Sequence, residues 1–110
     1  MLSDATVTNE AAELISMVKK FWNNAVSEIK VTSMTDEPFD MFTLSMRIYK
    51  NYDVLMEYDR GTLSIKVKLQ NQYTVLSRLA DEPVYRGFEG YKPDNLLHNF
   101  AILDKVLRAL

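Results

Sequence analysis

Two stretches in the middle of the chain alternate between apolar and polar residues, and this alternation constrains the fold more than any other feature. From Asp40 to Tyr49 every second residue is apolar, and the same pattern holds from Thr62 to Leu69. A period of two is typical of a β-strand that buries one face and exposes the other. The segment from Asp53 to Tyr58 fits another strand between them. The sequence therefore predicts an antiparallel meander.

The loop between the last two of these strands predicts their register. Directly opposed residues in an antiparallel pair share a face, so the loop length must keep apolar residues opposite each other. Pairing Tyr58 with Leu63 requires an even loop, either Arg60-Gly61 or Asp59 to Thr62. The glycine in both supplies the positive φ that a hairpin turn needs.

The other connections are less constrained. By the same reasoning Ile48 should oppose Val54, which leaves Lys50-Asn51-Tyr52 as a three-residue turn. The segment from Tyr73 to Ala80 fits a fourth strand or a short helix, and we favour the strand. Lys30 to Met34 fits either the end of a helix or a short strand.

Helical periodicity flanks the strands on both sides. From Thr8 to Ile29 the apolar residues fall on one arc of about 140°, which is wider than that of a typical surface helix, and the Thr8 hydroxyl can cap the helix start. Pro93-Asp94 suits the first turn of a second helix. There, apolar residues recur at spacings of four and three: Leu96, Phe100, Leu103, Leu107 and Leu110.

These patterns predict a single α+β domain over residues 1–110. We expect a two-layer sandwich, in which an antiparallel β-meander of three to four strands is covered on one face by the N- and C-terminal helices. Trp22 lies in the apolar arc of the first helix and should be substantially buried.

Composition excludes several classes of protein. The chain has no cysteine, so it can form no disulfide framework, thiolate zinc site or cysteine nucleophile. No apolar stretch approaches the ~20 residues of a membrane helix, and the first ten residues do not resemble a secretory signal. The net charge is −2, with acids close to the basic pairs, which argues against nucleic-acid binding. We therefore expect a small acidic cytoplasmic protein that does not bind membranes.

The sequence offers no candidate for catalysis. His98 is the only histidine, and helical placement puts it opposite the apolar stripe, where a surface role is expected. It also has no second histidine to form a zinc site. The glycines are not arranged as a phosphate loop or a nucleophile elbow. We expect no catalytic residue, metal ion or cofactor, and the residues favour a non-enzymatic protein.

The segment from Pro83 to Pro93 is the first candidate for a partner-binding site. It carries aromatic residues at every third position, with basic residues between them: Tyr85, Arg86, Phe88, Tyr91 and Lys92. Aromatic rings and arginine in a constrained loop are favoured contacts at protein interfaces. Alternatively, the rings fold back and seal one end of the core.

The outer face of the sheet is the second candidate surface. Arg47, Lys66 and Lys68 lie on that face in the predicted strands and could contact an acidic partner. The alternative is an ordinary solvated face, as expected for an antiparallel sheet whose other face is covered by helices.

We therefore expect a protein–protein interaction module of the accessory or adaptor type. One alternative is a small-ligand-binding protein or cryptic enzyme, whose pocket between helices and sheet takes polar contacts from Tyr58, Tyr73 or Arg78. A second alternative is a structural subunit that forms a homodimer through its apolar helices or an open sheet edge.

Overall fold

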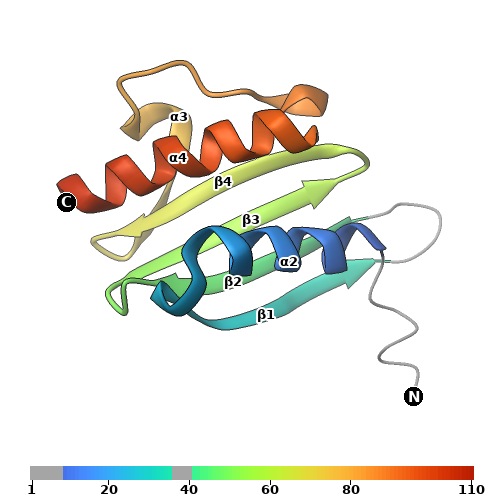
Figure 1. The fold of residues 1–110 in the computed structure, drawn as a ribbon, viewed down its shortest axis with the longest axis horizontal. Helices are drawn as coiled ribbons and strands as arrows, with labels where there is room; N and C mark the ends of the chain where they lie inside the picture. Colours follow the sequence, from blue (N-terminus) through green and yellow to red (C-terminus); the bar gives the residue numbers. More distant parts are fainter. Residues whose placement is uncertain (1–8, 36–40) are drawn as a thin grey trace.

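The chain forms a five-stranded antiparallel sheet in which each strand pairs with its neighbours in sequence (Figure 1). The computed structural model describes residues 9–35 and 41–110. The strands are β1 (Val26–Thr35), β2 (Met41–Ile48), β3 (Tyr52–Asp59), β4 (Thr62–Leu69) and β5 (Gln72–Val75). The helices are α2 (Asn9–Trp22), α3 (Leu76–Leu79) and α4 (Pro93–Ala109), with 3-10 turns η1 (Asn23–Ala25) and η2 (Gly87–Tyr91).

The two long helices cover the same face of the sheet, which confirms the predicted two-layer α+β class (Figure 1). Apolar side chains of β2, β3 and β4 alternate inward, as the period of two predicted. They pack against the apolar faces of α2 and α4, where Trp22 is 5% exposed and Phe100 is fully buried. The prediction that Trp22 is buried is confirmed. None of the helices within the described ranges is long and apolar enough to cross a bilayer.

The sheet has five strands rather than three or four, because the prediction of the first helix was wrong at its end. Helix α2 stops at Trp22 and not at Ile29, since Asn23 adopts a left-handed φ of 55°. Glu28 has a φ of 53° and lies where the β1–β2 register shifts, so β1 contains a bulge. Because of this extra residue, the apolar residues on either side of the bulge are three positions apart in the sequence, which is also the spacing of residues on one face of a helix. The predicted cap, Thr8, lies outside the described residues.

The register between β2 and β3 differs from the prediction by two residues. Ile48 pairs with Tyr52, and the turn is Tyr49-Lys50-Asn51. A shift of two keeps every side chain on its face, so apolar alternation cannot distinguish the two registers. The chain instead turns at Tyr49 (φ 56°), whose N–H donates to the carbonyl of Ala25 at 2.7 Å.

The β3–β4 turn and the start of the last helix agree with the sequence analysis. Tyr58 pairs with Leu63 across the two-residue turn Arg60-Gly61, as predicted. A second two-residue turn, Gln70-Asn71, joins β4 to β5. The segment from Tyr73 to Ala80 is a strand in its first half and a helix in its second half, because β5 ends at Val75 and α3 begins at the next residue. Helix α4 begins at Pro93 as predicted.

A single carboxylate joins both long helices to the β2–β3 turn. The indole N–H of Trp22 donates to Asp104 Oδ1 at 3.1 Å, and the Tyr49 hydroxyl donates to the same oxygen. Arg108 Nε donates to Asp104 Oδ2 at 2.7 Å. Burial alone would raise the pKa of Asp104, but the hydrogen bonds from Tyr49, Arg108 and Trp22 outweigh it and hold the pKa below its ordinary value.

Candidate protein-binding site

The Pro83–Pro93 segment, called the aromatic loop below, passes the β3–β4 turn and leads into α4. One of its three rings folds back onto the core. The Tyr91 ring lies edge-on to Tyr58 at 4.8 Å between centroids, and Tyr58 stacks on Phe42 at 4.9 Å. Tyr91 therefore closes this end of the core, as the alternative interpretation of the loop expected, and it fixes η2 against the sheet.

The Phe88 ring, in contrast, does not pack onto the core and is exposed to solvent. Its side chain is 70% exposed, the largest value among the exposed large apolar residues of the described ranges. The ring lies against Gly61, where a Cβ would be only 3.2 Å from two ring carbons. Gly61 also has a φ of +93°, so this turn position favours glycine for two independent reasons. The fold thus holds a phenylalanine ring at the surface.

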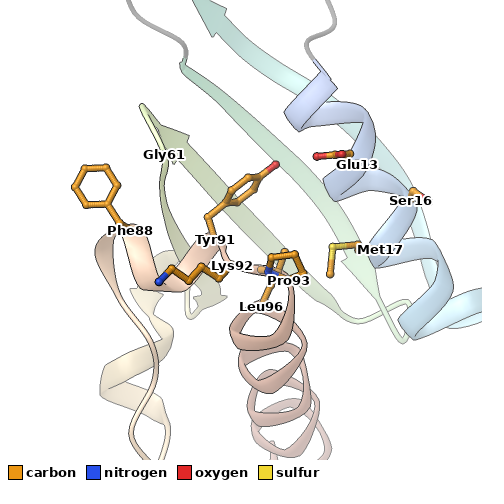
Figure 2. A pocket seen from close by; sticks show the side chains of 9 residues that line it. All are labelled: Glu13, Ser16, Met17, Gly61, Phe88, Tyr91, Lys92, Pro93 and Leu96. Carbon is orange, nitrogen blue, oxygen red and sulfur yellow. The ribbon is translucent and has the colours of Figure 1, made fainter.

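A groove runs beside this ring, between the first turns of α2 and the start of α4. Its volume is about 530 Å³. Figure 2 shows Tyr91 between Phe88 and the side chains of α2. The lining residues are Glu13, Ser16, Met17, Gly61, Phe88, Tyr91, Lys92, Pro93 and Leu96.

The chemistry of this groove suits an apolar side chain. Leu96 is buried and Met17 is half-buried, so the walls are well supported by the core. The ionisable groups lie on opposite sides, Glu13 on α2 and Lys92 at the start of α4 (Figure 2). Lys92 forms an exposed ion pair with Glu89 at 3.0 Å. A ligand could therefore be bound by apolar contact and oriented by these charges.

The first part of the aromatic loop faces elsewhere. Asn99 is 2% exposed, and its side-chain amide forms two hydrogen bonds with the backbone of Tyr85. The Tyr85 N–H donates to Asn99 Oδ1 at 3.0 Å, and Asn99 Nδ2 donates to the Tyr85 carbonyl at 3.0 Å. Tyr85 and Arg86 line a second groove of about 290 Å³ along β4. The five predicted partner-binding residues are thus divided between two grooves.

Replacing Asn99 with leucine should loosen the first part of the loop without changing the shape of α4. The substitution leaves the N–H and carbonyl of Tyr85 unpaired, and each unpaired group costs about 1–3 kcal/mol. We expect a loss of stability of about 2–6 kcal/mol and faster amide hydrogen exchange at Tyr85. Unchanged exchange at Tyr85 would show that the side-chain amide of Asn99 does not hold the loop.

The structure does not bring together the residues named for a ligand-binding pocket. Tyr58 is 7% exposed in the core, whereas Tyr73 is 42% exposed on β5. Arg78 is exposed on α3. His98 is also exposed, with its ring 5.2 Å from that of Tyr85. Among the described residues, no three metal-ligating side chains form a cluster.

Two of the three cations predicted on the outer sheet face, Arg47 and Lys66, have acidic neighbours. Arg47 pairs with Glu28 at 3.2 Å and Asp53 at 3.1 Å, and its hydrogen bond with Asp53 raises the pKa of Arg47. Lys66 pairs with Glu57 at 2.9 Å, while Lys68 is exposed. An acidic partner on this face would compete with these pairs, which makes the aromatic loop the stronger candidate.

Sequence reasoning missed the residues that complete both grooves. Met17 and Glu13 belong to α2 and meet the aromatic loop only through the tertiary fold. Asn99 did give a signal, because it is a polar residue three positions after Leu96 and four before Leu103, on the apolar stripe. A polar residue on a buried helix face must find a hydrogen-bond partner, which here is the backbone of Tyr85.

Comparison with known proteins found no family model that matches the chain and no significant match among curated proteins or solved structures.

Proposed function

We propose that the chain is a protein–protein interaction module that binds an apolar segment of its partner in the groove beside Phe88. The observation that carries this proposal is the ring of Phe88, which is 70% exposed yet positioned on Gly61 at the edge of an apolar groove. Burying such a ring would stabilise the protein by about 1.5–3 kcal/mol relative to leaving it exposed. A partner that covers Phe88 recovers this free energy.

The surroundings of Phe88 support the same proposal. Tyr91 and Leu96 extend the apolar surface inward, and both are anchored in the core. Interfaces gain most of their free energy from a few aromatic anchors in rigid pockets. A flexible loop would lose more conformational entropy on binding. This loop is held at one end by Tyr91 and at the other by the two hydrogen bonds between the Asn99 side chain and the backbone of Tyr85.

A photo-crosslinking amino acid at position 88 tests the proposal in cells. Position 97 is the matched control, because Leu97 is also a large exposed apolar residue, at 45%, but lies on α4 outside the groove. We expect position 88 to capture a partner that position 97 does not. The purified partner should then bind Phe88→Ala at least about 10-fold more weakly and bind Leu97→Ala as it binds the unmodified protein.

Two results would contradict this function. Crosslinked products that are the same at positions 88 and 97 would show that the captured proteins do not recognise the groove. Equal affinity of the partner for Phe88→Ala and Leu97→Ala would remove Phe88 from the interface.

A further inference from the structure

The surface that carries Phe88 holds both an exposed aromatic ring and a recess that suits one. The Phe88 ring is 70% exposed on η2, and the groove beside it has a volume of about 530 Å³. Recesses of several hundred Å³ with apolar walls are typical binding sites for apolar groups. The ring of one copy of this chain is therefore a group that the groove of another copy can accept.

The ring and the far wall of the groove lie on opposite sides of it. Figure 2 shows Phe88 and Lys92 on the side of η2, and Glu13 and Met17 on the side of α2. A twofold axis through this surface brings the η2 side of one copy against the α2 side of the other. Phe88 of each copy then reaches Met17 of the other, and contacts between a thioether and an aromatic ring are favourable.

The charges of this surface become complementary in the same arrangement. Glu13 is exposed on α2 and forms no ion pair with another residue of the described ranges. Lys92 lies on the opposite side of the groove, so the twofold axis places Lys92 of one copy near Glu13 of the other. This contact occurs twice in the dimer, because each copy supplies one carboxylate and one ammonium group.

Lys92 is able to make this contact, although it already has an acidic neighbour. It pairs with Glu89 at 3.0 Å, but the two side chains are 61% and 57% exposed, and exposed pairs contribute little to stability. Glu89 also accepts a hydrogen bond from Asn95 Nδ2 at 3.3 Å. Glu89 therefore keeps a partner when Lys92 contacts Glu13 of a second copy.

We propose that a second copy of this chain occupies the groove beside Phe88 when no other protein is bound. In this twofold dimer each Phe88 enters the groove of the other copy, and each Lys92 pairs with Glu13 of the other copy. The inference rests on the proposed function, because it names an occupant of the same groove. The groove is lined by 9 residues, against roughly 20–30 on each side of a stable interface. The dimer is therefore weak, and a partner that binds more tightly displaces the second copy.

Sedimentation equilibrium of the purified protein tests for the dimer. We expect a reversible equilibrium between monomer and dimer, with a dissociation constant of about 1–100 μM. Phe88→Ala should dimerise at least about 10-fold more weakly, and Leu97→Ala should dimerise as the unmodified protein does. A monomer at every concentration up to about 500 μM, or a dimer that Phe88→Ala does not weaken, would overturn the proposal.

Exchanging the two charges tests how the copies are arranged. Glu13→Lys and Lys92→Glu each place like charges together in both contacts, so each variant alone should dimerise at least about 10-fold more weakly. A mixture of the two variants should form a heterodimer about as tightly as the unmodified protein dimerises, because both contacts then join opposite charges. Both positions are exposed, so both variants should unfold at the same urea concentration as the unmodified protein.

Lys68→Glu is the matched control for the mixture. Lys68 is exposed on the outer sheet face, and its substitution changes the net charge by the same amount as Lys92→Glu. Glu13→Lys should bind Lys68→Glu at least about 5-fold more weakly than it binds Lys92→Glu. Equal affinity in the two mixtures would overturn the proposed contact between Glu13 and Lys92.

The dimer and the proposed function can fail separately. A protein that stays monomeric, but whose position 88 captures a different protein in cells, would overturn the dimer and leave the proposed function intact. A dimer that responds to the variants as expected, with no other protein captured at position 88, would support the dimer and contradict the binding of a different partner.

Discussion

Replacing Phe100 with alanine is expected to lower the free energy of unfolding by about 3–5 kcal/mol, the range for truncating a large buried aromatic residue. Phe100 is fully buried, and its ring lies 4.9 Å from Trp22 and 5.6 Å from Phe21. It therefore packs α4 directly against α2. Removing the ring leaves a cavity between the helices that neither can fill without moving off the sheet.

Urea unfolding followed by the fluorescence of Trp22, the only tryptophan, measures this change directly. Phe88→Ala is the control, because it removes the same ring from a surface position and should change stability by less than about 0.5 kcal/mol. A loss below about 1 kcal/mol for Phe100→Ala would contradict the packing of α4 against α2.

The second large effect is expected from Asp104→Asn, which should lower stability by about 2–3 kcal/mol at neutral pH. The carboxylate accepts from Trp22, Tyr49 and Arg108 and has a side chain only 19% exposed. Asparagine can still accept at one oxygen, but its NH₂ group would face the guanidinium of Arg108. Equilibrium unfolding at pH 7 compares the variant with the unmodified protein.

The same carboxylate predicts a dependence of stability on pH. The pKa of Asp104 is lower in the folded protein than in the unfolded chain, where it is near 3.9. Its contribution is therefore complete above the unfolded value and is lost as pH falls through the folded value. Stability measured from pH 7 down to about pH 2 should fall less steeply in Asp104→Asn than in the unmodified protein.

Glu82 provides the control for this pH experiment. Its hydrogen bond and ion pair with Lys105 lower the pKa of Glu82, but the pair lies in solvent. Exposed pairs contribute little to stability. Glu82→Gln should therefore keep the acid dependence of the unmodified protein. Identical acid dependence in Asp104→Asn would show that its carboxylate is not the group that titrates.

The sequence predicted the parts of the fold that depend on neighbouring residues. Alternation identified the buried faces of β2, β3 and β4, and Gly61 marked the one turn whose register was predicted correctly. Features that depend on distant contacts were missed. The Tyr49 turn is set by the carbonyl of Ala25, and the bulge at Glu28 gave β1 a helical spacing.

The candidate site shows the same division. The sequence of the aromatic loop identified Phe88 and Tyr91 as candidates, because aromatic residues recur at every third position between Pro83 and Pro93. Their opposite roles could not be predicted, because only the fold places Tyr58 beneath Tyr91 and Gly61 beneath Phe88. The groove requires α2, more than sixty residues earlier in the chain, to lie beside η2.

The order of the strands has a consequence for the speed of folding. Every strand pairs with the next one along the chain, so each pairing closes only a short loop and costs little chain entropy. Proteins dominated by such local contacts fold faster than those with distant strand pairings. The contact between Trp22 and Phe100 is different, because it joins helices at opposite ends of the chain. We expect the sheet to form early, and the meeting of α2 and α4 to complete folding.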